Sequence, residues 1–67
     1  MDVDDVASLI EQMGDLLKLS LTDAEKNDKG NSAAGVRVRK HMQDVKALAQ
    51  TVRERVLYNR EQKALGS

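Results

Sequence analysis

Apolar residues in the first half of the chain recur three and four positions apart, which is the spacing of one face of an α-helix. This stripe consists of Val3, Val6, Ile10, Met13 and Leu17, and Leu9 and Leu16 widen it along one flank. Asp2 is the expected N-cap, because an Asp side chain accepts hydrogen bonds from the free backbone N–H groups of a first turn. The pattern predicts a helix over residues 2–26, continuous through Ser20 although a capping-box-like sequence begins there.

A short polar segment, residues 27–32, separates this helix from a second one. Its composition is that of a loop in which Gly30 takes a positive φ and Asn31 or Ser32 caps the next helix. The second helix is predicted over residues 33–63, with apolar positions at heptad spacing. These positions are Val38, Met42, Val45, Ala49, Val52 and Val56. The predicted fold is all-α, a two-helix antiparallel hairpin whose second helix overhangs the first around residues 58–63.

A single hairpin of 67 residues gains little from its own core unless disulfides, metals or further copies support it. The chain has no cysteine, one histidine and one aromatic residue. One hairpin also leaves parts of both stripes in water, including Leu9, Leu16 and Leu48. We therefore expect a dimer or higher homo-oligomer, built as a helical bundle or coiled-coil-like assembly. Its expected core consists of Val6, Ile10, Met13, Leu16, Leu17, Val38, Met42, Val45, Leu48, Ala49, Val52 and Val56.

Catalytic, metal and cofactor chemistry have no matching pattern in the sequence. His41 has no cysteine or second histidine beside it, so we interpret it as a surface or interface residue. Asp2, Asp4 and Asp5 lack the later glycine and glutamate of a calcium loop. No stretch reaches the ~18–20 apolar residues of a membrane span, and the acidic start is unlike a signal peptide. We expect a cytoplasmic, non-enzymatic protein without cofactor, metal, membrane or small-molecule substrate.

Charge is divided unevenly along a chain whose net charge is zero. Residues 1–28 hold eight acids and two bases, whereas residues 29–67 hold nine bases and three acids. Four bases share one heptad position beside the second stripe, and we name them the basic ladder: Arg39, Lys46, Arg53 and Arg60. Each step of this ladder rises ~10.5 Å along the helix. Arg37, Lys40 and Arg55 lie on the outer and opposite flanks.

Most of these cations have no acid three or four residues away on their own helix, and only Lys40 has one, Asp44. From the first helix, Asp2 and Asp23 are placed to reach across the hairpin. A row of cations without internal partners suits contact with a phosphate backbone, where affinity comes from counterion release. The alternative is a structural oligomerisation or protein-interaction module whose basic ladder pairs with acidic faces of partner copies.

The run from Gly30 to Gln50 resembles the core motif of the bacterial histone-like family, named for the chlamydial nucleoid-condensing, linker-histone-like protein and including short Bacteroidetes-type members. The matching positions are Gly30, Asn31, Ala33, Ala34, Gly35, Arg37, Val38, Arg39, Lys40, Met42, Gln43, Lys46, Leu48, Ala49, Gln50 and Arg53. The resemblance implies a nucleoid-associated, DNA-compacting protein without enzymatic activity, from a bacterium or a phage. It places the family's basic residues at Arg37, Arg39, Lys40, Lys46 and Arg53.

The expected partner is double-stranded DNA, bound mostly without regard to sequence. The predicted DNA-binding residues are the family positions together with the remaining cations of the second helix: Arg37, Arg39, Lys40, Lys46, Arg53, Arg55 and Arg60.

Overall fold

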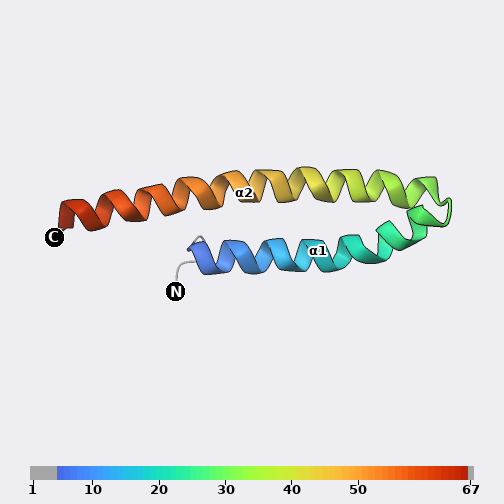
Figure 1. The fold of residues 1–67 in the computed structure, drawn as a ribbon, viewed down its shortest axis with the longest axis horizontal. Helices are drawn as coiled ribbons and strands as arrows, with labels where there is room; N and C mark the ends of the chain where they lie inside the picture. The colour runs from blue at the N-terminus through green and yellow to red at the C-terminus, as the bar shows by residue number, and fades with distance from the viewer. Residues whose placement is uncertain (1–4, 67) are drawn as a thin grey trace.

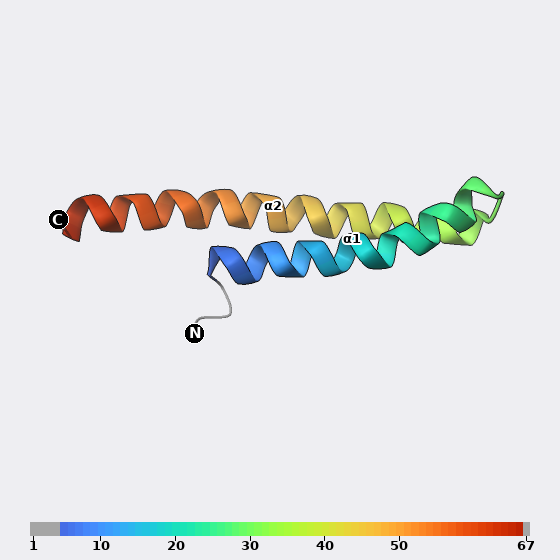
Figure 2. The ribbon, with the colours of Figure 1, turned by 60° about the horizontal axis from the view of Figure 1, so that its bottom comes forward.

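The fold consists of two antiparallel α-helices joined by a tight turn, as the spacing of apolar residues predicts (Figure 1). The computed structural model describes residues 5–66, with side chains described for residues 5–63. Helix α1 spans Val6–Asp28 and helix α2 spans Ser32–Gly66. Figures 1 and 2 show the helices side by side, with the C-terminal part of α2 extending past the start of α1. The resulting rod measures 55 × 18 × 13 Å.

Helix α1 is capped by Asp5. The residue is extended, with φ −70° and ψ 162°, and its carboxylate accepts a 2.7 Å hydrogen bond from the backbone N–H of Ser8. This is the geometry in which an Asp side chain satisfies a free donor of the first turn. The prediction of Asp2 as the cap is wrong for α1, which begins at Val6; Asp2 itself lies outside the described residues.

Ser20 is a packing residue and does not interrupt α1. Its side chain is 5% exposed, and its hydroxyl donates a 2.8 Å hydrogen bond to the backbone carbonyl of Leu16. Bonding back into the preceding turn satisfies the hydroxyl inside the helix. The helix therefore continues through the capping-box-like sequence to Asp28, two residues beyond the expected end at residue 26.

The turn has the hydrogen bonds of a Schellman motif, in which a residue with positive φ ends a helix. Gly30 has a φ of 98°. Its N–H donates to the carbonyl of Asn27 at 2.9 Å, and the N–H of Asn31 donates to the carbonyl of Lys26 at 3.1 Å. These bonds satisfy two of the carbonyls left free at the end of α1. The chain therefore reverses within fewer residues than the loop expected over 27–32.

Helix α2 starts immediately after the turn because Asn31 caps it. The side-chain carbonyl of Asn31 accepts a 3.0 Å hydrogen bond from the backbone N–H of Ala34. Asn27 supports the same turn, since its side-chain amide donates a 3.1 Å hydrogen bond to the backbone carbonyl of Asn31. A Cβ atom at Gly35 would collide with the amide of Asn27, so the absence of a side chain at Gly35 leaves room for this bond.

Replacing Gly30 by alanine is expected to destabilise the protein by about 1–2 kcal/mol. A Cβ at Gly30 would meet no atom within 4 Å, so the cost arises from the positive φ and not from a collision. Lys29→Ala, at the neighbouring position with φ −90°, is the matched control and should leave stability nearly unchanged. Thermal unfolding followed by circular dichroism measures both variants. Equal melting temperatures would contradict the assigned role of Gly30.

The contact between the helices is thin. Among the described residues the buried side chains are Leu9, Ser20 and Ala34, and no large side chain is fully buried. Half-buried residues surround them on both helices: Val6, Met13, Leu16, Val38, His41, Val45, Leu48, Ala49 and Val52. Burial of small and partly covered side chains removes little apolar surface from water, so the hairpin alone has a weak core.

This contact is rotated relative to the stripes expected from the sequence. Four predicted central residues are exposed, by 39–53%: Ile10, Leu17, Met42 and Val56. Residues expected at the flanks take the places that face the other helix: Leu9, Leu16, His41 and Leu48. The apolar stripe on each helix is wider than one helix–helix contact, so only part of it is covered. The small side chains of Ser20 and Ala34 mark the covered part.

Candidate nucleic-acid interface

The basic ladder lies along one edge of α2, and Arg39, Lys46, Arg53 and Arg60 are all exposed. An uninterrupted helix keeps residues seven apart on one side, so the four cations form a single row with ~10.5 Å between successive members. Within the described part of the chain, none of the four forms an ion pair with a carboxylate. Their charges are therefore directed to solvent, where an anionic partner is able to reach them.

Arg37, in contrast, is held by α1. Its Nε donates a 3.1 Å hydrogen bond to Oδ1 of Asp23, and its Nη2 lies 3.0 Å from the same oxygen. The hydrogen bond from Arg37 holds the pKa of Asp23 below the usual range of an Asp carboxyl. Asp23 is one of the two acids that the sequence places within reach across the hairpin. This family-motif arginine therefore already has a partner within the chain.

Arg55 faces α1 and is only partly exposed. Its guanidinium carbon lies 5.1 Å from the centre of the Tyr58 ring, within cation–π distance. Hydrogen bonds from Ser8 are the main cause of a lowered pKa at Asp5, and the positive charge of Arg55 contributes to it. Of the seven predicted DNA-binding cations, Arg37 and Arg55 thus interact with their own chain, in contrast to the four cations of the exposed ladder.

Lys40 is exposed on the outer side of α2. The ion pair that the sequence allows between Lys40 and Asp44 does not form in the described structure. Lys40 is separated from the ladder around the helix, because a step of one residue turns an α-helix by about 100°. It is therefore available to solvent but does not extend the ladder row.

Two glutamines that the charge pattern did not reveal lie between the ladder cations. A shallow open depression on α2 is lined by Gln43, Lys46, Ala47, Ala49, Gln50 and Arg53. The side-chain amide of Gln50 donates a 3.1 Å hydrogen bond to Glu54. Gln43 and Gln50 are seven residues apart, which is also the spacing of the ladder cations. This shared spacing was the feature of the sequence that could have placed the two glutamines beside the ladder. Amide donors beside cations add neutral hydrogen-bonding capacity toward phosphate oxygens.

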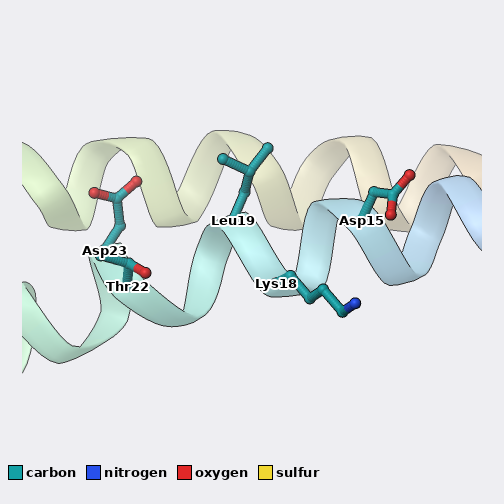
Figure 3. A pocket seen from close by; sticks show the side chains of 5 residues that line it. All are labelled: Asp15, Lys18, Leu19, Thr22 and Asp23. Atoms are coloured by element: carbon teal, nitrogen blue, oxygen red, sulfur yellow. The ribbon is translucent and has the colours of Figure 1, made fainter.

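A second open depression lies on α1 alone and is lined by Asp15, Lys18, Leu19, Thr22 and Asp23 (Figure 3). Its mixed charges and open shape give it neither a basic character nor an enclosed cavity. Groups of three or more metal-ligating side chains are not found among the described residues. Over the same residues, no helix combines the length and the apolar character needed to cross a lipid bilayer.

The run from Gly30 to Arg53 divides into two structural parts. Its first part builds the turn, through the positive φ of Gly30, the cap of Asn31, the complete burial of Ala34 and the missing side chain of Gly35. Its second part carries the exposed ladder along α2. The turn thus sets where α2 begins and how it packs on α1, and this packing decides which edge of α2 faces solvent.

These features define a small helical-hairpin protein with a basic edge. A family model described as "Histone H1-like protein Hc1" matches residues 7–62, which is most of the chain, and the protein belongs to this family. Searches among curated proteins and among solved structures give no match. Family membership identifies a histone-like protein of a non-enzymatic type and supports a nucleoid-associated, DNA-binding role. The family match does not distinguish the Bacteroidetes-type members to which the sequence was compared.

Proposed function

We propose that this protein binds double-stranded DNA through the phosphate backbone, using the basic ladder on α2. The observation that carries the proposal is the row of four exposed cations without ion pairs to carboxylates in the described structure, on a chain of the histone-like family. Cations in such a row displace the counterions condensed on DNA, and the released counterions supply the affinity. Contacts to phosphates carry no sequence information, so the binding is independent of base sequence.

The acidic half of the chain sets the orientation of the protein on DNA. Residues 1–28 have six more acids than bases, and most of this segment forms α1. Because DNA repels this helix, the ladder edge of α2 faces the duplex and α1 faces away. A protein with zero net charge then binds weakly unless the ladder is correctly oriented. In the proposed function it acts in the nucleoid of a bacterial cytoplasm, as an assembly of identical copies.

A titration of DNA affinity against salt tests the proposal. If a dimer places three or four ladder cations of each α2 on phosphates, the slope of log K against log salt should be about −5 to −7. Unrelated duplex sequences should bind with equal affinity. Absence of binding to DNA at ~20 mM salt, where charges are screened least, would overturn the proposal. The protein would then be better described as a structural interaction module whose basic ladder meets acidic partners.

Asp23→Asn is expected to strengthen DNA binding. The substitution weakens the hold of α1 on Arg37, whose side chain is already 50% exposed, and so frees this arginine for a phosphate. One additional phosphate contact steepens the salt slope by about 0.9. Asp15→Asn is the matched control, because it removes the same charge from the exposed surface of α1, and Asp15 forms no ion pair within the described residues. Equal affinities of the two variants would show that Arg37 does not compete between Asp23 and DNA.

A further inference from the structure

An apolar groove runs between the helices on the side of α1 opposite the open depression lined by Asp15 and Asp23. It is lined by Ile10, Met13, Gly14, Leu17, Ala49 and Val52, and Arg53 of the basic ladder lies at its edge. Ile10 and Leu17 remain 53% and 50% exposed there. Beyond the groove, Met42 and Val56 continue the apolar positions along α2, 39% and 49% exposed. A helical face of this length and character is unusual on the surface of a small monomer.

The total surface of the chain gives an independent measure of what is uncovered. Its accessible area is 5413 Å². A compact monomer of 7.4 kDa has an expected area of about 4200 Å². A standard protein–protein interface removes about 600–1000 Å² from each partner. The excess of about 1200 Å² is larger than the area that one standard interface removes from each partner. The elongated hairpin therefore has enough uncovered surface for such an interface, and the groove is the apolar surface on which it would form.

We propose that a second copy of this chain covers the groove, with α1 of one copy lying across α2 of the other. The groove has the repeating apolar positions on both of its walls that a self-complementary interface requires. Four helices then enclose Ile10, Leu17 and Ala49 in a common core, and each helix lies antiparallel to its neighbours. This core supplies the burial that the thin contact within one hairpin lacks.

Charge selects this arrangement over one that stacks α2 on α2. Because Arg53 borders the groove and the other ladder residues share its heptad position, α2 stacked on α2 would bring two rows of cations together. Like charges facing each other across an interface oppose association. With α1 across α2, the two ladders are kept apart. Only the inner side of each ladder borders the edge of α1 that contains Gly14 in the other copy, and its outer side stays open to solvent. A Cβ built at Gly14 meets nothing within 4 Å, so this edge has open space for a partner helix.

The arrangement has a consequence for DNA binding that rests on the proposed function. The two-fold axis that places α1 across α2 runs along the bundle, and it carries the two ladders to opposite sides. A dimer therefore presents one basic edge to each of two duplex segments, and the phosphate contacts behind the expected salt slope are divided equally between these segments. A hairpin alone presents only one edge, so holding two segments together requires the second copy.

Sedimentation in the absence of DNA tests the assembly separately from DNA binding. The unmodified protein should sediment at about twice its mass of 7.4 kDa. Leu17→Asp should weaken association by about a hundred-fold or more, because it buries an unpaired charge in the shared core. Leu19→Asp is the control, because Leu19 is 61% exposed but lies about 200° around α1 from Leu17, in the open depression with mixed charges. A monomeric unmodified protein, or equal masses of the two variants, would overturn the proposal.

Cross-linking tests the arrangement and does not depend on the folding of a charged variant. The chain has no cysteine, so Gly14→Cys and Ala49→Cys can be made as separate single variants. Mixing them with a short bismaleimide should give a covalent pair that contains one chain of each kind, identified by mass spectrometry. Products made only of like chains would overturn the placement of α1 across α2. DNA that fails to bind while mixed pairs form would overturn the proposed function and leave the assembly intact.

Discussion

Reversing Arg39, Lys46 and Arg53 to glutamate is expected to abolish retention of DNA without lowering helix content. The three side chains are exposed on one edge of α2, so their reversal removes cations and adds repelling anions without opening the contact between the helices. The two subunits of one dimer together lose about six phosphate contacts. Because the affinity for DNA derives from counterion release, this loss removes most of it. Fluorescence anisotropy with a labelled duplex at low ionic strength measures the loss, and circular dichroism measures helix content.

The control reverses three exposed lysines outside the ladder, Lys18, Lys26 and Lys29, and produces the same change in net charge. If DNA binding depended only on net charge, the two triple variants would lose affinity equally. If it depends on the ladder, the control should retain most of its affinity and most of its salt slope. Equal losses would therefore contradict the assignment of the ladder as the contact surface, even if both variants bind less than the unmodified protein.

The helices and their turn were predictable because local rules decide them. Heptad spacing and the absence of proline specify α2, and the positive φ needed at the end of α1 specifies Gly30. The N-cap was not predictable from residue type, because an Asp at either position 2 or position 5 is a good cap. The helix begins at Val6, so Asp5 takes this place instead of the expected Asp2.

Which half of each apolar stripe faces the other helix was not predictable from periodicity. Leu9 and Ile10 are equally apolar neighbours, yet Leu9 is 4% exposed and Ile10 is 53% exposed. The difference arises because Leu9 lies on the side of α1 that faces α2 and Ile10 lies on the neighbouring side, which a step of one residue turns away by about 100°. Seven-residue periodicity did locate the ladder, because a heptad position specifies one edge of a helix whichever part of the stripe is covered.

The pairing of individual cations required the structure. The heptad position of Asp23 places it within reach of α2, but several cations of α2 were equally plausible partners. The turn fixes the axial position of α2 relative to α1 and so selects Arg37. Arg55 shows the same limit, since its heptad position predicted a flank and the fold turns it toward Tyr58 and the first residues of α1. Charge counts therefore identified the basic surface, whereas the fold decided which of its members remain available.

Val45→Asp is expected to remove helix content and self-association together. Val45 is half-buried on the side of α2 that faces α1, so a carboxylate there loses solvent without gaining a cationic partner. The cost of several kcal/mol is comparable to the whole stability of a small domain. Ala47→Asp is the matched control, because Ala47 is exposed on the outer side of the same helix and its substitution leaves the contact intact.

Circular dichroism and sedimentation, measured at the same micromolar concentrations, show whether helix content and self-association are lost together or independently. The described hairpin has no large fully buried side chain, so its helices gain too little from each other to persist once copies separate. The Val45→Asp variant should therefore be an unfolded monomer, and the unmodified protein should lose helix content on dilution as its copies dissociate. A cooperative, fully helical monomer at micromolar concentration would contradict this dependence, because the hairpin contact alone would then be sufficient for folding.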